Sequence, residues 1–481
     1  MYDLCIIGGG IVGTNIAREL SKYQLNILVL EKEEDIGCGA TKANSGIVHG
    51  GYVAKPDTLK GKLCIQGNRM YRQLNQQLNF GYKQTGALVL AFNQEDMEEL
   101  EKLYQSGIEN GVKEIEIIDR EQALQMEPNL NPDIAAALYC GEVGITSPYE
   151  FAIALMENAI DNGVTLKLNT EVKNIEKDNG IFTIDTGEKS YQARYIINSA
   201  GVFSDKIASM VGQNTFDILP RRGQYVIFDK GTGEKVNHVI FQVPSKKGKG
   251  ILVASTYHGN LMIGPNAEDT QNKEDVGTEK DALEEIVMTA KRSVPQFNLN
   301  QIIRTFSGIR ATPTTKDFII EETKEKGFIN VAGIESPGLT ASPAIALHVK
   351  DILKDMGVEL VLKEDFNPYR KPIIKEKNLK PEEIKDLLFI DSAPEKIICR
   401  CEGVSEAEIV DALHRNIDIY SPDAIKRRTR AGMGRCQGGF CESRVREIIS
   451  REKNIPLDQV PHREDQLKGK GEREKADFYR K

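Results

Sequence analysis

The chain begins with an apolar run, a stretch of glycines and a helical pattern. Residues Tyr2 to Ile7 are mostly apolar and predict a buried strand, and Gly8 to Gly13 follow directly with the sequence GGGIVG. The next residues, IVGTNIAREL, carry apolar side chains at helical spacing, and a second apolar run from Asn26 to Leu30 ends at Glu31. These patterns predict a strand, a tight turn, a helix and a second strand.

This unit has the spacing of a dinucleotide-binding site. Gly8 permits the tight turn, Gly10 lets the backbone approach a pyrophosphate, and Gly13 lets the helix pack closely on the sheet. The helix N-terminus directs its N–H groups toward the phosphates. Glu31 is placed to bind ribose hydroxyls, and an acidic residue here favours FAD or NAD over a nucleotide with a 2′-phosphate. The alternative is a glycine turn in an ordinary α/β domain.

Two later strands also end in glycine-containing turns. Tyr195 to Asn198 lead into the sequence SAG, and Phe328 to Ala332 lead into GIESPGLT, which precedes a helical pattern. A second helix N-terminus could therefore meet an anion, such as the N1–C2=O edge of a reduced flavin. The alternative is that both are plain strand-to-helix turns of a doubly wound sheet. The residues that these turns would bring to a cofactor are Gly201, Gly333, Gly338, Leu339 and Thr340.

Composition narrows the function classes. With 481 residues, 40% of them apolar, the chain has material for roughly three domains. Its 71 acidic and 63 basic residues give a net charge of −8, which argues against a nucleic-acid-binding protein. No apolar run approaches the length of a membrane span, and a predicted core strand follows Met1 almost at once, leaving no room for a signal peptide. We expect a cytoplasmic protein without a membrane span.

Four of the eight cysteines lie in one short C-terminal window, which indicates a metal site. Four thiolates in two close pairs fit either a [2Fe–2S] cluster or structural zinc. Ser405 and Ser421 each begin a predicted helix between the pairs, so a small helical module presents the ligands. The predicted ligands are Cys399, Cys401, Cys436 and Cys441. Nearby basic residues either offset the cluster's negative charge, dock an acidic partner or form a solvated face; they are Lys426, Arg427, Arg428, Arg430 and Arg435.

Several segments together resemble the D-amino-acid-oxidase-like FAD-dependent oxidoreductases. They are GGGIVG at residues 8–13, ANSGIVHGGY at 43–52, NSAG at 198–201, PRRGQY at 220–225, GPNA at 264–267 and SGIR at 307–310. The cysteine spacing and GRCQGGFC resemble the bacterioferritin-associated-ferredoxin-like domain, which binds [2Fe–2S]. The resemblance implies FAD and a [2Fe–2S] cluster as cofactors, with Asn44 and Ser45 near the flavin.

The resemblance also implies an architecture. It predicts an α/β fold in which a Rossmann-like FAD-binding domain, about residues 1–80, 147–215 and 311–365, is interleaved with an α+β substrate domain. A linker would follow at about 366–395, then a small helical [2Fe–2S] domain at about 396–450 and a charged tail at about 451–481.

Three residues are candidates for catalysis. His49 is the leading base, because the resemblance places its segment near the flavin and imidazole titrates near neutral pH. His258 is the second candidate for the base, and the alternative is that His258 is a turn histidine at a hairpin. Arg310 is a candidate clamp for a carboxylate or phosphate, and the pair Arg221 and Arg222 is a second. Two clamps would suit a dicarboxylate, whereas one would suit a phosphate monoester or a simple hydroxy acid.

The favoured hypothesis is a dehydrogenase in which a small anionic secondary alcohol reduces FAD. The [2Fe–2S] cluster would then pass electrons to a partner, which the resemblance implies is another flavoprotein or an electron carrier. The whole layout resembles the anaerobic glycerol-3-phosphate dehydrogenase large subunit, which favours oxidation of sn-glycerol 3-phosphate to dihydroxyacetone phosphate. The first half is most similar to L-2-hydroxyglutarate dehydrogenases, which keeps that substrate as the alternative. An amine or amino-acid substrate and a non-catalytic redox sensor are further alternatives.

Overall fold

The computed structural model describes residues 1–244, 250–373 and 396–462, which form two compact units. The first unit extends from Met1 to Pro368 and the second begins at Tyr369. The parts of the predicted linker and tail at 374–395 and 463–481 lie outside the described residues. None of the helices in the described ranges combines the length and apolar character needed to cross a bilayer. The cytoplasmic location stays a prediction.

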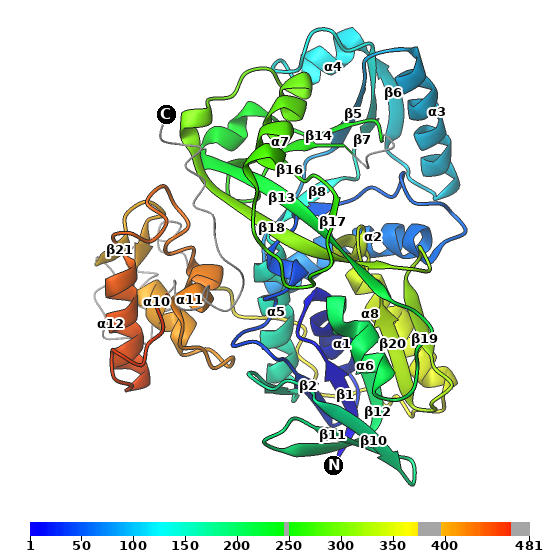
Figure 1. Cartoon of the computed structure of the whole chain (residues 1–481), viewed down its shortest axis with the longest axis vertical. Coiled ribbons are helices and arrows are strands. Elements are labelled where there is room, and N and C mark those ends of the chain that lie inside the picture. The colour runs from blue at the N-terminus through cyan, green and yellow to red at the C-terminus, as the bar shows by residue number, and fades with distance from the viewer. Residues whose placement is uncertain (245–249, 374–395, 463–481) are drawn as a thin grey trace. The chain divides into compact units, whose positions relative to one another are not determined.

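A mixed sheet with a parallel centre, flanked by helices, forms one half of the first unit (Figure 1). The predicted run Tyr2–Ile7 is strand β1, and it pairs in parallel with β2 on one side and β12 on the other; its residues from Leu4 to Ile7 are buried, as is typical of a central parallel strand. The strand order is β10-β11-β12-β1-β2-β9, and β20 continues the sheet from β12 with β19 beside it. The bounds are β1 Tyr2–Ile7, β2 Ile27–Leu30, β9 Thr165–Lys167, β10 Asn174–Asp178, β11 Ile181–Asp185, β12 Ser190–Asn198, β19 Ile319–Glu322 and β20 Phe328–Ala332.

Helices from distant parts of the chain cover this sheet. Helix α1 packs against both α5 and α8, and α8 also packs along α2. A Cβ atom on Gly67 of α2 would lie 2.1 Å from the Thr340 carbonyl oxygen of α8, so the two helices approach as closely as their backbones allow. The bounds are α1 Ile11–Leu20, α2 Leu59–Leu78, α5 Pro148–Asp161, α6 Ser204–Ser209 and α8 Gly338–Asp355.

A larger, mainly antiparallel sheet forms the other half of the first unit. Its order is β17-β13-β16-β15-β14-β5-β7-β6, with β18 pairing with β13. The long strands β13 and β18 run side by side, and their register sets Arg221 opposite Arg310 (Figure 1). Two apolar clusters form the core on this sheet. The bounds are β5 Ala87–Ala91, β6 Ile115–Asp119, β7 Ala136–Cys140, β13 Ile218–Lys230, β14 Val239–Gln242, β15 Leu252–Ser255, β16 Asn260–Gly264, β17 Glu268–Asp269 and β18 Ile302–Pro313.

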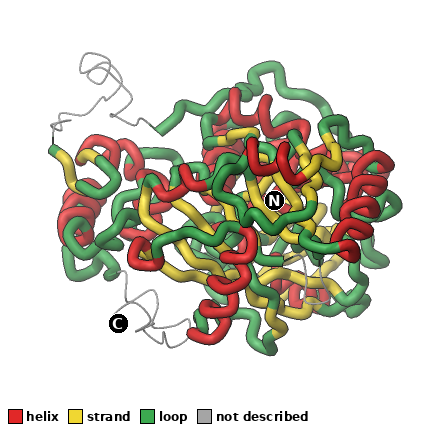
Figure 2. The backbone as a smooth tube through the Cα atoms, turned by 90° about the horizontal axis from the view of Figure 1, so that it is seen from above, coloured by secondary structure: helices red, strands yellow, loops and turns green. Residues whose placement is uncertain are grey.

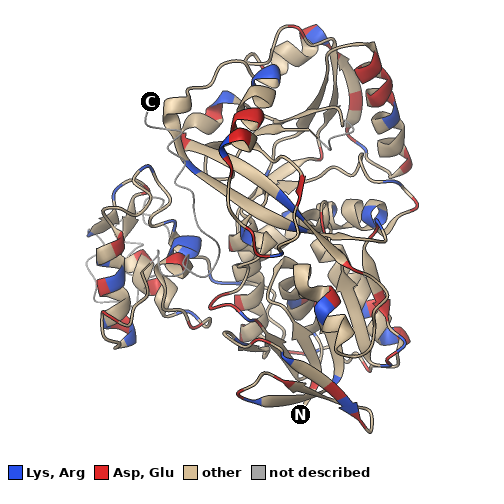
Figure 3. Cartoon of the chain, in the orientation of Figure 1, with Lys and Arg blue, Asp and Glu red and all other residues tan. Residues whose placement is uncertain are grey.

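The two halves alternate along the chain, which confirms the predicted interleaved α/β architecture. A small sheet of β3 (Ile47–Val48), β8 (Gly144–Thr146) and β4 (Tyr82–Gln84) also belongs to this unit. Helices α4 (Arg120–Met126) and α7 (Lys280–Ser293) accompany the larger sheet, together with α3 (Gln94–Glu109). Acidic residues are conspicuous on α3 (Figure 3).

The second unit is mostly helix and loop, with one short pair of strands (Figure 2). As predicted, Ser405 and Ser421 cap helices, because their hydroxyls accept the Glu408 and Ala424 backbone N–H groups at 3.2 and 3.1 Å. The bounds are β21 Ile397–Cys399, β22 Val404–Ser405, α10 Glu406–Leu413, α11 Pro422–Thr429 and α12 Glu442–Lys453.

Folded structure continues beyond residue 451, where the sequence predicts a charged tail. Helix α12 extends to Lys453, and Val460 is buried. The Arg446 guanidinium explains the difference, because it donates hydrogen bonds to the carbonyl oxygens of Leu457 and Val460 and so fastens the following segment to the helix.

Candidate functional site

The glycine turn after β1 is packed so tightly that side chains are excluded at two positions. A Cβ on Gly13 would lie 2.0 Å from the Gly8 carbonyl oxygen, and a Cβ on Gly8, which has a φ of +107°, would lie 2.5 Å from the Ser199 carbonyl oxygen. A Cβ on Gly10 would meet only the Thr41 hydroxyl, at 3.4 Å. Space therefore remains beside Gly10 at the N-terminus of α1, where a pyrophosphate fits.

Glu31 lies at the end of β2 and is directed back at this turn. Its Oε2 accepts the Gly9 N–H at 2.7 Å and its Oε1 accepts the Glu33 N–H at 2.9 Å. Burial raises the pKa of the Glu31 carboxyl, and the two backbone N–H groups oppose that shift. Each carboxylate oxygen can accept a further hydrogen bond, so the geometry leaves room for ribose hydroxyls.

The loop before β3 is shaped by Asn44. Its amide nitrogen donates to the carbonyl oxygens of Ala40 and Thr41, and its Oδ1 accepts the Gly46 N–H at 2.8 Å. Ser45 is half-buried in the same turn. The side chain of Asn44 is thus engaged in holding the loop rather than directed away from it.

The other predicted turns differ in the space around them. Gly201 has a φ of +59° and no heavy atom within 4 Å of where a Cβ would stand, so its surface is open. Gly333, with a φ of +67°, is closed off because a Cβ would lie 2.6 Å from Pro313. A ligand can approach the turn at Gly201 more closely than the turn at Gly333.

The first turn of α8 anchors the segment that carries His49. The Thr340 hydroxyl accepts the His49 backbone N–H at 2.8 Å, and the carbonyl oxygen of Leu339 accepts the Tyr71 hydroxyl. Gly338 begins the helix, and its N–H is bonded to the Glu335 carbonyl oxygen. The structure therefore brings Gly338, Leu339 and Thr340 together with His49, which the sequence could not show.

The His49 ring lies near two side chains that the sequence did not single out as site residues. Its Nε2 lies 3.5 Å from the Ser336 hydroxyl, and its ring stacks on Phe241 of β14 at a centroid distance of 6.1 Å. The carbonyl oxygen of His49 accepts a hydrogen bond from the Asn68 amide at 3.0 Å. Ser336 lies in the ESPG turn after β20, and the proline and glycine of that turn were visible in the sequence. Phe241 has no sequence feature that indicates a site.

Arg310 reaches across β13 from its place on β18. Its Nη2 donates to the Asn266 carbonyl oxygen at 2.9 Å, and a Cβ on Gly223 would lie 2.5 Å from that nitrogen, so the glycine makes room for the guanidinium. The Tyr225 phenol is also hydrogen-bonded to Arg310; burial raises its pKa, and the guanidinium opposes the shift. Across the described part of the chain, no carboxylate lies within ion-pair distance of Arg310.

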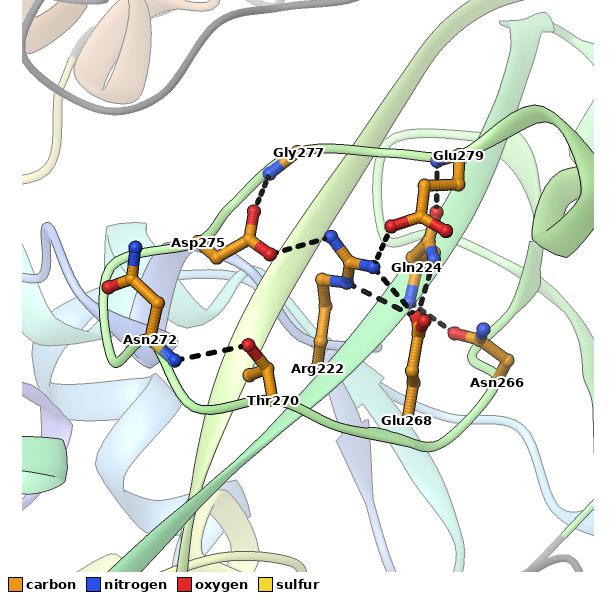
Figure 4. A network of polar contacts seen from close by, with 9 residues as sticks. All are labelled: Arg222, Gln224, Asn266, Glu268, Thr270, Asn272, Asp275, Gly277 and Glu279. Atoms are coloured by element: carbon orange, nitrogen blue, oxygen red, sulfur yellow. Dashed lines mark hydrogen bonds and ion pairs between the residues drawn. The ribbon is translucent and has the colours of Figure 1, made fainter.

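Arg222 is surrounded by acidic side chains (Figure 4). It donates to Glu268 through Nε and Nη2 at 3.2 and 3.0 Å, to Asp275 through Nη1 at 2.9 Å, and to Glu279 through Nη2. Its side chain is only 5% exposed. Arg221 forms an ion pair with Asp269 at 3.3 Å. Of the second anion clamp that the sequence left open, Arg222 is therefore occupied by the chain's own carboxylates, and Arg221 has one carboxylate partner.

His258 lies apart from Arg310. Its Nε2 is 2.8 Å from Glu150 of α5, and it stands in the hairpin between β15 and β16. Asn266, which contacts Arg310, follows the opposite end of β16. By contrast, the neighbours of His49 and Arg310, Phe241 and Tyr225, belong to one apolar cluster. The structure thus brings His49 and Arg310 to the same face of the larger sheet.

The four C-terminal cysteines form two pairs. The Sγ atoms of Cys401 and Cys436 lie 3.6 Å apart, and the thiols of Cys399 and Cys441 are hydrogen-bonded to each other, which lowers the pKa of Cys399 and raises that of Cys441. No three metal-binding side chains converge on a single point within the described residues. Two pairs of thiolates suit a [2Fe–2S] cluster, with one pair on each iron, better than one zinc ion held by all four.

Comparison with known sequences agrees with both sites. The model of the FAD dependent oxidoreductase family matches residues 3–352, and that of the BFD-like [2Fe-2S] binding domain matches residues 397–451. The chain belongs to the FAD dependent oxidoreductase family. The predictions of FAD and of a [2Fe–2S] cluster are thereby confirmed.

Three relatives of this FAD dependent oxidoreductase are informative. A glycerol 3-phosphate dehydrogenase of Caloramator mitchellensis is 51% identical over 96% of each chain. The mitochondrial L-2-hydroxyglutarate dehydrogenase of Homo sapiens is 33% identical over 55% of this chain and 61% of its own. The solved structure of the L-alpha-glycerophosphate oxidase of Mycoplasma pneumoniae with FAD bound has a TM-score of 0.74 at 32% identity and covers 78% of this chain and 99% of its own.

The basic residues near the cluster of this oxidoreductase are mostly internal. Arg427, Arg428 and Arg430 are buried. Arg430 forms a two-pronged ion pair with the buried Glu402, at 3.0 and 3.2 Å. These three arginines therefore stabilise the module from within and do not form a solvated face.

Proposed function

We propose that this protein is a dehydrogenase that oxidises sn-glycerol 3-phosphate to dihydroxyacetone phosphate and releases the electrons through its [2Fe–2S] cluster to a protein acceptor. The observation that carries the proposal is the 51% identity to a glycerol 3-phosphate dehydrogenase along 96% of both chains, which includes the cluster module. Arg310 supports it from the structure, because among the three candidate clamp arginines it is the one with no carboxylate at ion-pair distance in the described residues.

Arg310 binds the phosphate in this proposal. Its planar guanidinium can grip a tetrahedral anion through two parallel hydrogen bonds, while the bond to the Asn266 carbonyl oxygen fixes its orientation. Because Arg222 and Arg221 are paired with acidic side chains, a substrate with one anionic group fits better than a dicarboxylate.

His49 takes the hydroxyl proton in this proposal. Oxidation of the alcohol carbon requires loss of a hydride from carbon and of a proton from oxygen, and FAD supplies the hydride acceptor. The Nε2 of His49 receives the proton, with Phe241 and Ser336 orienting the ring. His258 is not part of this set, because it pairs with Glu150 at the far end of β16.

The FAD site follows from the glycine turn. Gly8, Gly10 and Gly13 would accept the pyrophosphate at the N-terminus of α1, and Glu31 would bind the ribose hydroxyls. The flavin ring would lie near the loops and helix end that flank His49. These residues are Asn44, Ser45, Gly201, Gly333, Gly338, Leu339 and Thr340.

A [2Fe–2S] cluster would supply one-electron transfer. Cys399, Cys401, Cys436 and Cys441 would hold the two irons, and the cluster would pass electrons singly to a partner protein.

An anaerobic titration tests the function. We expect sn-glycerol 3-phosphate to bleach the visible absorbance of the oxidised flavin, with its mirror form sn-glycerol 1-phosphate as the matched control. L-2-Hydroxyglutarate is the second candidate, favoured by the similarity of the first unit to the human enzyme. Bleaching by hydroxyglutarate alone would replace the proposed substrate, and bleaching by neither would remove the substrate class.

A further inference from the structure

Phe440 stands on the surface beside the cluster ligands. In the sequence it follows Gly439 and precedes Cys441. Its side chain is 86% exposed, the highest value of any large apolar residue in the described ranges. The ring is not on a loose loop: Gly439 N–H donates to the Cys436 carbonyl oxygen at 3.0 Å, and Cys441 N–H donates to Gly438 at 3.1 Å. The ligand turn thus holds an aromatic ring in water, an arrangement that is unfavourable unless another surface covers it.

The exposed charges next to the ligands are positive. Arg400 stands between Cys399 and Cys401, Arg435 precedes Cys436, and Arg444 lies in the first turn of α12; all three are exposed. The neighbouring carboxylates are less available, since Glu402 is buried against Arg430 and Glu442 is half-buried. A basic surface surrounds the ligands although the whole chain carries a charge of −8.

Cysteine exposure marks the side from which the cluster is approached. Cys401 is exposed and its partner Cys436 is half-buried, whereas Cys399 and Cys441 are buried. Electron transfer between proteins needs a close approach of the two centres, so the Cys401 and Cys436 side of the cluster is the natural exit.

We propose that Phe440 together with Arg400, Arg435 and Arg444, here called the Phe440 surface, docks an acidic one-electron carrier protein that accepts electrons from the cluster. The aromatic ring supplies the apolar anchor and the arginines steer the acidic partner into place. This proposal rests on the proposed function for the source of the electrons.

The transfer itself is a single-electron step. The reduced cluster loses one electron and is oxidised, and the metal centre of the carrier gains that electron and is reduced; no bond forms or breaks and no proton moves. Two such steps remove the electron pair that one substrate molecule delivers.

Binding to the holoenzyme tests the surface without turnover. Oxidised cytochrome b5, an acidic haem protein, is titrated calorimetrically into the oxidised holoenzyme, with the basic cytochrome c as the charge control. We expect cytochrome b5 to bind with an affinity that falls as salt is added, and Phe440→Ala and Arg444→Glu each to raise its Kd at least tenfold. Leu457→Ala removes another exposed apolar side chain of the same unit, 43% exposed, and should leave the Kd unchanged.

Absence of cytochrome b5 binding to the wild-type holoenzyme, or equal binding by the Phe440→Ala variant, overturns the proposal. Cluster absorbance measured on each variant verifies that the site is intact.

A second measurement tests whether the Phe440 surface meets the carrier or the flavin-containing unit of the same chain. After rapid anaerobic addition of sn-glycerol 3-phosphate, the cluster absorbance of Phe440→Ala should bleach at the wild-type rate, while its reduction of cytochrome b5 should fall at least tenfold. A slower bleaching of the cluster would mean that the surface meets the chain's own flavin unit, which overturns the proposal. If glycerol 3-phosphate reduces neither the wild-type protein nor the Phe440→Ala variant, the proposed function fails but the docking proposal does not. Transfer to cytochrome b5 can still be measured after the protein has been reduced with dithionite.

Discussion

The guanidinium of Arg310 donates a hydrogen bond of 2.9 Å to the backbone carbonyl oxygen of Asn266. Asn266 is itself fixed, because its Oδ1 accepts the Gln224 N–H at 2.8 Å and the Gln224 amide is bonded to Glu268, a partner of Arg222 (Figure 4). Arg222 therefore forms a hydrogen-bonded network with carboxylates, and this network orients Arg310 without neutralising its charge.

Replacement of Arg310 should weaken the use of substrate strongly. We expect Arg310→Ala to lower kcat/KM for glycerol 3-phosphate about 30- to 1000-fold, since a lost charge-assisted pair costs about 2 to 4 kcal/mol. Arg310→Lys should recover only part of this, because an ammonium lacks the planar fork. Steady-state kinetics check this, with Arg194→Ala as a control that should stay near wild type because Arg194 lies on β12 and is paired with Asp3 on the surface.

Removal of the imidazole at position 49 should slow the chemical step. We expect His49→Ala to reduce the rate of flavin reduction about 10²- to 10⁴-fold, the usual contribution of a general base. Stopped-flow absorbance at saturating substrate measures it. His258→Ala should retain most of the rate, since its partner is Glu150. An equal loss in both variants would contradict the assignment of His49.

A methyl group in the glycine turn should prevent FAD binding. In Gly13→Ala the new Cβ would lie 2.0 Å from the Gly8 carbonyl oxygen, so α1 must move away from the turn that holds the pyrophosphate. We expect a loss of bound FAD, measured by flavin absorbance per protein. Gly39→Ala is the matched control, because no atom lies within 4 Å of its Cβ and it should keep full FAD content.

Glu31 should give the FAD-free protein a defined pH dependence. Burial raises the pKa of Glu31 in the folded state above its ordinary value of 4.5, so ionisation favours the unfolded chain. The contribution of Glu31 to stability is thus fully present below pH 4.5 and is lost as pH rises through the raised pKa. Over that pH window the Tm of the wild type should fall relative to the Tm of Glu31→Gln, and above it the difference in Tm should stay constant. Glu321→Gln, at an exposed position, should show no such shift.

Loss of one cluster ligand should separate the two cofactors. We expect Cys401→Ser to lose iron and sulfide while keeping FAD, because the cysteines lie in the second unit and the glycine turn in the first. Substrate should still bleach the flavin, but cytochrome b5 reduction should fall to background. Iron analysis and flavin absorbance check this, with Cys38→Ser as a control. Retention of a normal cluster in Cys401→Ser would exclude Cys401 as a ligand.

Features set by neighbours in the chain could be predicted from the sequence. The apolar run Tyr2–Ile7 forms β1, Phe328–Ala332 form β20, and Ser405 and Ser421 cap their helices. Hydrophobic spacing, caps and glycine turns act over a few residues, so their signals are complete within a short segment. The motifs for FAD and for the cluster are of this kind.

The catalytic geometry depends on contacts between distant segments. Arg222 is bonded to carboxylates 46 to 57 residues away in the sequence, so it is not available as an anion clamp. His258 is bonded to Glu150 at a separation of 108 residues. Thr340 fixes the His49 backbone from 291 residues away. Such pairings exist only after two sheets and their helices have packed, because burial and strand register bring the groups together. The sequence by itself determined the fold class and both cofactors; the tertiary structure decided which arginine pairs with carboxylates and which histidine shares a face of the larger sheet with Arg310.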